Sequence, residues 1–347
     1  MRISIVCLFA LLLLASCATV SPEKSAQLTP EPIKVEAPKP PASETTPKLE
    51  PKAEAKPTPE TKPEPTTEVK PETKPITPAP ANISEAMTWY EKGFWLERYG
   101  KNEEAVKDYD KALELDPKLY MALIGKTFIL LGDKKTDEAL VCLDKALEIT
   151  PENVDAWSLK GNILDQMGKK EEALKSFEKV TELDPKNTSM WYQKAYILRN
   201  LEQHEQAIKT YDKVIELDPK IVNAYCGKGF SLRKLKRLDE ALVTYNQAVE
   251  IDVKYAEPVF GKGLVLEDLK QYDEALKAFD KTLELNSQYV IAWLEKARCY
   301  ALKGDKQNTL TFLKKAIELY PQWKETINKD DIFKNYWSDP EFQKLVK

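Results

Sequence analysis

The sequence predicts an all-α protein that folds as an α-α solenoid of about seven helical hairpins, and three regularities support this prediction. The 347-residue chain repeats every 34 residues from Ala86 to Trp323 without an insertion. Within each repeat, apolar residues at positions 4, 8 and 11, and again at 20, 24 and 27, share one face of a helix, because side chains three or four residues apart are neighbours there. Proline closes five of the seven repeats and ends the second helix, since it cannot continue one. Each hairpin buries its apolar face only against its neighbours, so we expect the hairpins to stack.

Residues 1–16 are expected to be a lipoprotein signal peptide. The apolar run that follows Arg2 is too short for a membrane span of about 20 residues, but it suits a signal sequence. The run ends in Leu14-Ala15-Ser16-Cys17, which resembles the lipobox of bacterial lipoproteins. That resemblance implies cleavage before Cys17 and a diacylglyceryl group on its sulfur, whose chains contribute about 0.8 kcal/mol per buried CH₂. The alternative is an ordinary signal peptide in which Cys17 has no role.

The residue after Cys17 bears on localisation. It is Ala18 rather than Asp, which in a bacterium with two membranes resembles lipoproteins sent to the outer membrane. We therefore expect a lipid-anchored protein of the cell envelope. It would lie on the outer membrane facing the periplasm in such a host, and otherwise on the outer face of the cell membrane.

Residues 17–82, here called the tether, are expected to be disordered. Sixteen of the 23 prolines lie between Ser21 and Pro80, a stretch without aromatic residues in which Lys and Glu alternate. Such a composition buries too little apolar surface to offset the entropy of ordering. The tether is then a spacer that holds the following domain away from a membrane; a Pro-rich ligand for partner domains or the cell wall is the alternative.

The repeats begin at Ala86, Tyr120, Val154, Thr188, Val222, Ala256 and Val290. Position 20 needs a small residue, because a neighbouring helix approaches closely there. It is occupied by Ala105, Ala139, Ala173, Ala207, Ala241, Ala275 and Thr309. Position 24 carries a large apolar residue in every repeat: Tyr109, Leu143, Phe177, Tyr211, Tyr245, Phe279 and Leu313. Position 4 is most often Trp or another large residue: Trp89, Leu123, Trp157, Trp191, Tyr225, Val259 and Trp293.

This set resembles the tetratricopeptide repeat, whose Trp, Leu-Gly, Tyr, Ala, Phe, Ala and Pro recur at the same offsets. The resemblance covers about two-thirds of the chain and implies a right-handed superhelix over residues 83–323. One departure from the pattern and the segment after the repeats add two expectations. Gly132 comes two positions early, so we expect the first helix of the second repeat to end short. Residues 324–347 are expected to form short helices that cap the last apolar face.

The family resemblance also implies a binding surface. First helices in the family line a concave groove through positions 2, 5, 9, 12 and 13, and here positions 5 and 9 are largely aromatic or apolar. We expect a segment or helix of a partner protein to bind there through apolar anchors. The alternative is that some of these rings pack between adjacent first helices. The expected groove residues are Tyr90, Phe94, Ile124, Phe128, Tyr192, Tyr196, Phe230 and Phe260.

Position 7 is lysine in all seven repeats: Lys92, Lys126, Lys160, Lys194, Lys228, Lys262 and Lys296. One interpretation is a row of cations that binds an acidic ligand at the repeat spacing. The other, which we favour, is that each alkyl stem packs on the helix surface while the ammonium group reaches solvent.

The composition argues against nucleic-acid binding and against most catalytic and metal-binding sites. A formal charge of −4 argues against nucleic acid, which favours a basic face. His204 is the single histidine, and we expect it in a turn, exposed to solvent, so catalytic triads and His-ligated metals are excluded. Cys142, Cys226 and Cys299 fall in separate repeats and are expected to be apolar fillers. We therefore predict no enzyme activity, catalytic residue, metal, cofactor or small-molecule substrate.

The predicted function is a membrane-anchored scaffold that mediates protein–protein interaction or complex assembly in the cell envelope. A second hypothesis is binding of cell-wall glycan, with Trp and Tyr rings stacking on sugars. Because most of the tryptophans occupy position 4, a packing position, the sequence favours the first hypothesis.

Overall fold

The computed structural model describes residues 81–347, and these fall within one compact unit of paired helices without a strand. The predicted signal peptide, Cys17 and nearly all of the tether lie outside the described residues. No helix within residues 81–347 combines the length and apolar character that crossing a bilayer requires.

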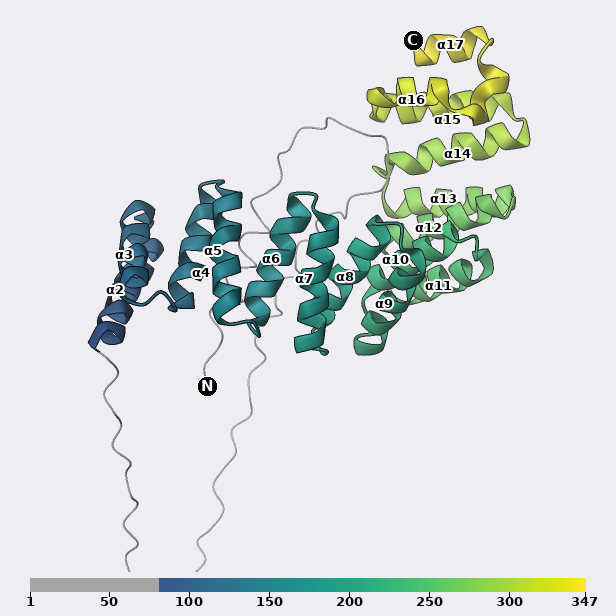
Figure 1. Cartoon of the computed structure of the whole chain (residues 1–347). Coiled ribbons are helices and arrows are strands. Elements are labelled where there is room, and N and C mark those ends of the chain that lie inside the picture. Colours follow the sequence, from purple (N-terminus) through teal and green to yellow (C-terminus); the bar gives the residue numbers. More distant parts are fainter. Residues whose placement is uncertain (1–80) are drawn as a thin grey trace, which may run out of the picture. The chain divides into compact units, whose positions relative to one another are not determined.

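Seven helical hairpins follow one another along the chain, as predicted (Figure 1). The first helices of the hairpins are α2 (Ala81–Arg98), α4 (Tyr120–Gly132), α6 (Val154–Gln166), α8 (Thr188–Asn200), α10 (Val222–Lys234), α12 (Ala256–Asp268) and α14 (Val290–Lys303). The second helices are α3 (Asn102–Leu115), α5 (Thr136–Ile149), α7 (Lys170–Leu183), α9 (His204–Leu217), α11 (Leu238–Ile251), α13 (Tyr272–Leu285) and α15 (Lys306–Leu319). The two helices of each hairpin pack on each other, and the second helix packs on the first helix of the next hairpin. The all-α solenoid is therefore confirmed.

The expectation that α4 ends short at Gly132 is wrong. Helix α4 has 13 residues, the same length as α6, and Gly132 is its last residue. The left-handed turn after the first helix falls at repeat position 15, where Lys134 has a φ of 61°. The second repeat therefore places a non-glycine residue in this conformation, at a cost of about 1–2 kcal/mol, and Gly132 is not needed for the turn.

Alanine and glycine allow the second helix of one hairpin and the first helix of the next to approach closely. Ala207 and Tyr211 of α9 are fully buried. Gly227 of α10 faces that ring so closely that an added Cβ would lie 2.2 Å from Tyr211 Cζ. The next pair of helices shows the same arrangement. A Cβ added to Gly261 of α12 would lie 2.3 Å from Cε1 of Tyr245 of α11. The aromatic residue at position 24 therefore needs a glycine on the facing first helix.

The C-terminal segment caps the array, as predicted. It consists of η1 (Pro321–Trp323), α16 (Lys324–Lys329), η2 (Asp331–Tyr336) and α17 (Pro340–Val346). Phe333 and Phe342 are fully buried and share one core cluster with Leu294 and Leu313 of the last hairpin. These rings cover the apolar face that an eighth repeat would otherwise cover.

Helix α2 has no such cover among the described residues. Trp95, at repeat position 10, is 56% exposed, and Tyr99 is 76% exposed. Position 10 is at most 4% exposed in the six later repeats, where the preceding hairpin packs on it: Ile129, Ile163, Ile197, Ser231, Val265 and Cys299. The two ends of the described array therefore differ, because only the C-terminal end is capped.

Candidate functional site

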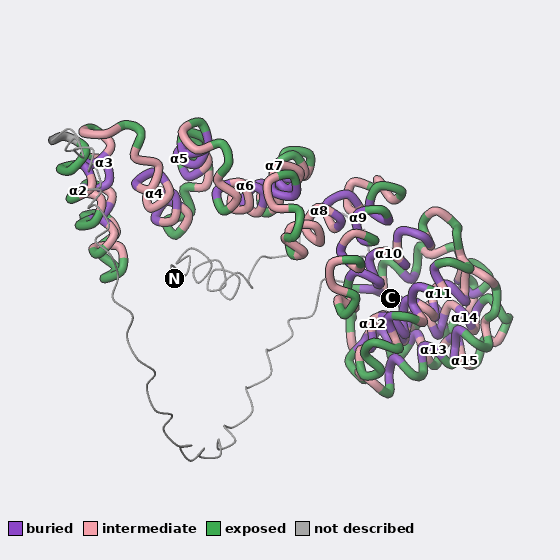
Figure 2. The backbone as a smooth tube through the Cα atoms, turned by 90° about the horizontal axis from the view of Figure 1, so that it is seen from below, coloured by how far each residue is buried: buried purple, intermediate pink, exposed green. Residues whose placement is uncertain are grey.

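We define the first-helix face as the residues at positions 2, 5, 9, 12 and 13 of the seven first helices. Along each helix, partly exposed residues alternate with buried ones (Figure 2). Seven of the eight predicted groove residues are half-buried on this face: Tyr90, Phe94, Ile124, Phe128, Tyr192, Tyr196 and Phe230. Half-burial means that one side of each side chain packs on the protein while the other meets solvent.

Phe260 does not fit the groove assignment. Its ring is only 4% exposed, and it lies 4.9 Å from the ring of Tyr289 and 5.6 Å from that of Phe279, measured between centroids. Phe260 is therefore a core residue, as the packing alternative held. The helices of the sixth and seventh repeats enclose it, which position 5 alone did not indicate.

The first repeat supports its rings with its own second helix. Tyr90 packs against Tyr109 at 5.9 Å and against Phe94 at 6.3 Å. The Tyr109 hydroxyl donates a 2.6 Å hydrogen bond to Glu97, and burial raises the pKa of that carboxyl above its usual value. Arg98 covers Phe94, with the guanidinium carbon 5.7 Å from the ring centre. The rings are thus fixed in place before any partner arrives.

A second group of rings lies on α8 and α10. Arg199 places its guanidinium carbon 4.8 Å from the ring centre of Tyr196 and 5.3 Å from that of Phe230. The Lys234 ammonium lies 5.4 Å from the same Phe230 ring. Tyr192, one turn before Tyr196, packs edge-on against the buried Tyr211 at 6.0 Å, and burial raises its pKa to about 12.

The expectation that His204 is a solvent-exposed turn residue is wrong. His204 begins α9, is half-buried, and packs edge-on against Phe230 at 6.2 Å. Burial lowers its pKa below the usual value. The neutral ring therefore supports the first-helix face from the side, a role that a single histidine in a polar stretch of sequence did not indicate.

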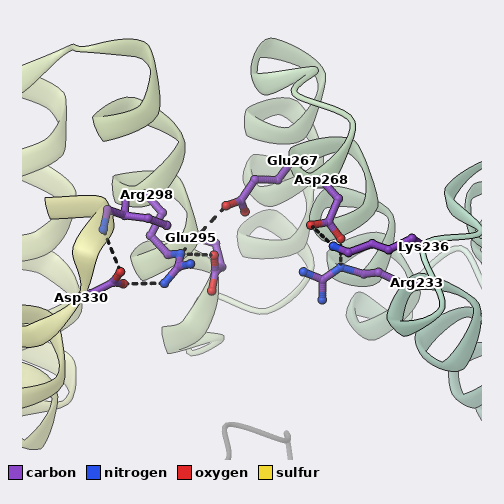
Figure 3. Close-up of polar contacts among 8 residues, drawn as sticks. Arg233, Lys236, Glu267, Asp268, Glu295, Arg298 and Asp330 are labelled. Atoms are coloured by element: carbon purple, nitrogen blue, oxygen red, sulfur yellow. Dashed lines mark hydrogen bonds and ion pairs between the residues drawn. The ribbon is translucent and has the colours of Figure 1, made fainter. Parts of the chain in front are cut away.

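Beside this group lies an open hollow of about 250 Å³ lined by Arg233, Lys234, Lys236 and Asp268. Arg233 Nε lies 2.7 Å from one Asp268 oxygen, and the Lys236 ammonium lies 3.5 Å from the other (Figure 3). The hollow joins the fifth and sixth repeats, and its lining carries three cations against one carboxylate.

At the end of the first-helix face, charged groups replace rings (Figure 3). Arg298 lies between Glu295, at 3.1 Å, and Asp330 of the cap, at 2.5 Å, with Glu267 at 4.0 Å. The carboxyl groups of Glu267 and Glu295 interact with each other and with Arg298. Burial and the neighbouring carboxylate raise the pKa of Glu267 to about 8, and burial raises the pKa of Glu295. Glu267 therefore keeps its proton at neutral pH.

The position-7 lysines pair with acids of the preceding repeat, which sequence reasoning missed. In five repeats the ammonium lies within 4 Å of the carboxylate at position 25 of the repeat before. These lysine–acid pairs are Lys126–Asp110, Lys160–Asp144, Lys194–Glu178, Lys228–Asp212 and Lys296–Asp280. The first lysine, Lys92, pairs within its own repeat with Asp108. The recurrence of a lysine at position 7 and an acid at position 25 every 34 residues was the signal from which these pairs could have been predicted.

Because these lysines are paired and also cover position-4 rings, they are structural cations and not a free row of charge. Their ammonium groups lie 4.7 to 5.4 Å from four tryptophan rings: Trp89, Trp157, Trp191 and Trp293. Lys262 differs, since Asn246 occupies position 25 of the repeat before it and no described acid pairs with it.

An acid at position 246 would give Lys262 the partner that the other lysine–acid pairs have, and should stabilise the array. We expect Asn246→Asp to raise the free energy of unfolding by a few tenths of a kcal/mol, since a partly exposed ion pair contributes about 0.2–1 kcal/mol. Thermal unfolding followed by circular dichroism at low salt checks this, with Asn246→Ala as the control. A gain that persists undiminished in 1 M NaCl would contradict an ion pair as its cause.

The described residues 81–347 contain no cluster of three or more His, Cys, Asp or Glu side chains placed to hold a metal ion. Cys142, Cys226 and Cys299 are buried, and burial raises the pKa of each thiol. These thiols pack as apolar groups, in keeping with the sequence expectation.

Family models described as tetratricopeptide repeat match residues 86–119, 154–187, 188–221, 222–254 and 260–322. Together these stretches make up more than half of the chain. None of the curated proteins compared with the chain matches it.

Solved structures share the fold. A tetratricopeptide repeat protein from Parabacteroides merdae ATCC 43184 is 16% identical, with a TM-score of 0.50 over 76% of this chain and 99% of the other. YrrB, a TPR protein with an unusual peptide-binding site, is 25% identical, with a TM-score of 0.47 over 53% and 95% of the two chains. PilF of Pseudomonas aeruginosa is 18% identical, with a TM-score of 0.47 over 65% and 95%. The first of these supports the fold alone.

Proposed function

The chain belongs to the tetratricopeptide-repeat family of protein–protein interaction scaffolds, and from this premise we propose a finer role. It holds a segment or helix of a partner protein on its first-helix face while a lipid on Cys17 anchors it in the cell envelope. The family is typically non-enzymatic, in keeping with the absence of a catalytic pattern from the sequence.

One observation carries the proposed binding surface. In the first, fourth and fifth repeats, Tyr90, Phe94, Tyr192, Tyr196 and Phe230 at positions 5 and 9 are half-buried and held by neighbouring rings or cations, and Phe128 of the second repeat is half-buried as well. Such pre-positioned rings lose little entropy when a partner covers them, and large aromatic side chains dominate binding energy in protein interfaces. An apolar segment of a partner would bury the exposed side of each ring.

Support for the envelope role comes from the sequence alone. Cys17 follows Leu14-Ala15-Ser16 at the end of an apolar run, and the tether places about 60 residues between it and α2. At about 5–6 Å × √n, a flexible chain of that length spans roughly 45 Å. The proposed lipid would therefore hold the array near a membrane without restricting which face meets a partner.

Glycan binding has less support. The position-4 tryptophans that would stack on sugars are half-buried beneath lysine ammonium groups. The indole N–H groups of Trp157 and Trp191 also donate hydrogen bonds to the carbonyls of Pro151 and Pro185. Sugar stacking at these rings would displace those contacts.

The proposal is tested with the full chain in its native cells by crosslinking and identification of the captured proteins. Replacing Phe94, Phe128, Tyr192 and Phe230 with serine is expected to reduce capture of the specific partner at least tenfold, because these rings supply its apolar contacts. Val141→Ser with Val243→Ser is the matched control, since both valines are exposed on second helices. Unchanged capture by a four-ring variant with a normal helical circular-dichroism spectrum would contradict the binding surface.

The same experiment includes Cys17→Ser to test the anchor. This variant is expected to leave the membrane fraction for the soluble fraction and to lose incorporation of labelled fatty acid. A Cys17→Ser chain that still carries the label would refute lipidation at this residue.

A further inference from the structure

The rings and cations on α8 and α10, together with Lys236, form one surface. We define the cationic–aromatic cluster as Tyr196, Arg199, Phe230, Arg233, Lys234 and Lys236. Resting on the proposed function, we infer that this cluster binds an acidic side chain of the partner segment, an Asp or Glu flanked by apolar residues.

Unpaired charge is the first argument. Arg199 and Lys234 lie over the Phe230 ring, and no carboxylate in residues 81–347 pairs with either. By contrast, five of the position-7 lysines on the same first helices are paired with an acid of the repeat before. Two cations left without acids on the face that carries the rings therefore have capacity for a carboxylate from outside.

The local balance of charge favours the same ligand. Arg233 and Lys236 share a single carboxylate, that of Asp268, so the cluster holds four cations against one acid in direct contact. Other acids near the cluster add little free charge. Glu257 accepts a 2.6 Å hydrogen bond from Tyr255, Glu202 and Glu205 are open to solvent beside His204, and Glu267, which Arg233 also influences, has a pKa raised to about 8. An added carboxylate would meet net positive charge.

Geometry sets the kind of ligand. The hollow lined by Arg233, Lys234, Lys236 and Asp268 has a volume of about 250 Å³, which suits one short side chain and not a larger ligand. The Arg199 guanidinium offers a planar fork of N–H donors that matches a carboxylate, and the rings on either side hold it in place. Tyr196 and Phe230 supply apolar contact for the residues that flank the acid.

A polyanion fits less well than a single acidic side chain. The whole chain carries a formal charge of −4, the Asp268 carboxylate lines the hollow itself, and the carboxylates of Glu295 and Asp330 lie beside Arg298 in the last repeat. These groups would repel an extended row of phosphates, whereas one Asp or Glu in a peptide contacts only the cationic–aromatic cluster.

The test uses a displayed library of random 12-residue peptides, selected on the immobilised full chain. Enriched peptides and their Asp→Asn or Glu→Gln analogues are then compared by fluorescence anisotropy. We expect enriched peptides to carry an acid beside aliphatic or aromatic residues. We expect the neutral analogues to bind about tenfold or more weakly, since charged hydrogen bonds contribute about 1.5–3 kcal/mol.

The double variant Arg199→Gln with Lys234→Gln should bind the acidic peptides and their neutral analogues equally. Lys209→Gln with Lys220→Gln, at exposed positions outside the cluster, is the control and should keep the preference. Matching thermal unfolding curves show that both variants fold. Enriched peptides without an acid preference, or with one that survives Arg199→Gln with Lys234→Gln, would overturn this inference and leave the proposed function standing. Failure to enrich any peptide would contradict both.

Discussion

Replacing Gly227 with alanine is expected to destabilise the array by about 1–3 kcal/mol, although alanine favours a helix over glycine by about 1 kcal/mol. The new Cβ would lie 2.2 Å from Cζ and 2.5 Å from the hydroxyl oxygen of Tyr211. That ring is fully buried among Ala195, Leu198 and Ala207, so it cannot move aside without displacing the helices that enclose it. Urea unfolding followed by circular dichroism measures the change.

Gly132 provides the matched control. It also lies in a first helix, but an added Cβ there meets no atom within 4 Å. Gly132→Ala is therefore expected to stabilise the chain slightly through helix propensity. If Gly227→Ala proved no less stable than Gly132→Ala, the close packing of helix on helix described for α9 and α10 would be incorrect.

The second large effect is expected at Glu267. Its carboxyl has a pKa of about 8 in the folded chain, above the ordinary value of 4.5, because burial and Glu295 disfavour its charge. The folded state thus keeps a proton that the unfolded state releases. Stability from this group is complete below about pH 4.5 and is lost as the pH rises toward 8, with a slope of at most about 1.4 kcal/mol per pH unit.

Glu267→Gln removes this requirement for a proton, because the neutral amide has nearly the size and shape of the protonated acid and also offers a donor. We expect the variant to equal the parent at pH 5 and to exceed its free energy of unfolding at pH 8. Urea titrations at pH 5, 6, 7 and 8 give the difference, with Glu274→Gln, an exposed position on α13, as the control. Parallel pH curves for the parent and Glu267→Gln would contradict the raised pKa of Glu267.

The sequence predicted the hairpins because periodicity reports which residues share a face within one helix. Ala207 at position 20 and Tyr211 at position 24 are buried as expected, and the C-terminal cap covers the last hairpin. The same reasoning failed for Gly132, because the turn depends on the conformation at position 15 and not on where a glycine occurs.

The candidate site was harder to predict, because its geometry depends on contacts between repeats. Phe230 at position 9 and Phe260 at position 5 are both phenylalanines at positions expected to face the groove. Phe230 is half-buried, whereas Phe260 is enclosed by the following repeat. The network of Glu267, Glu295 and Arg298 joins two first helices through residues at three different repeat positions. No single column of the repeat pattern contains all three, so periodicity alone could not assemble them.

The lysine–acid pairs have a consequence for how such an array can change length. Position 7 of one repeat meets position 25 of the repeat before it, so most junctions are joined by the same pair of charges. Duplication or deletion of one whole 34-residue unit would bring a matching lysine and acid together at the new junction. Gene rearrangement could therefore lengthen or shorten the proposed partner-binding surface in whole steps, whereas a copy of the fifth repeat, with Asn246 at position 25, would carry its weaker junction wherever it was placed.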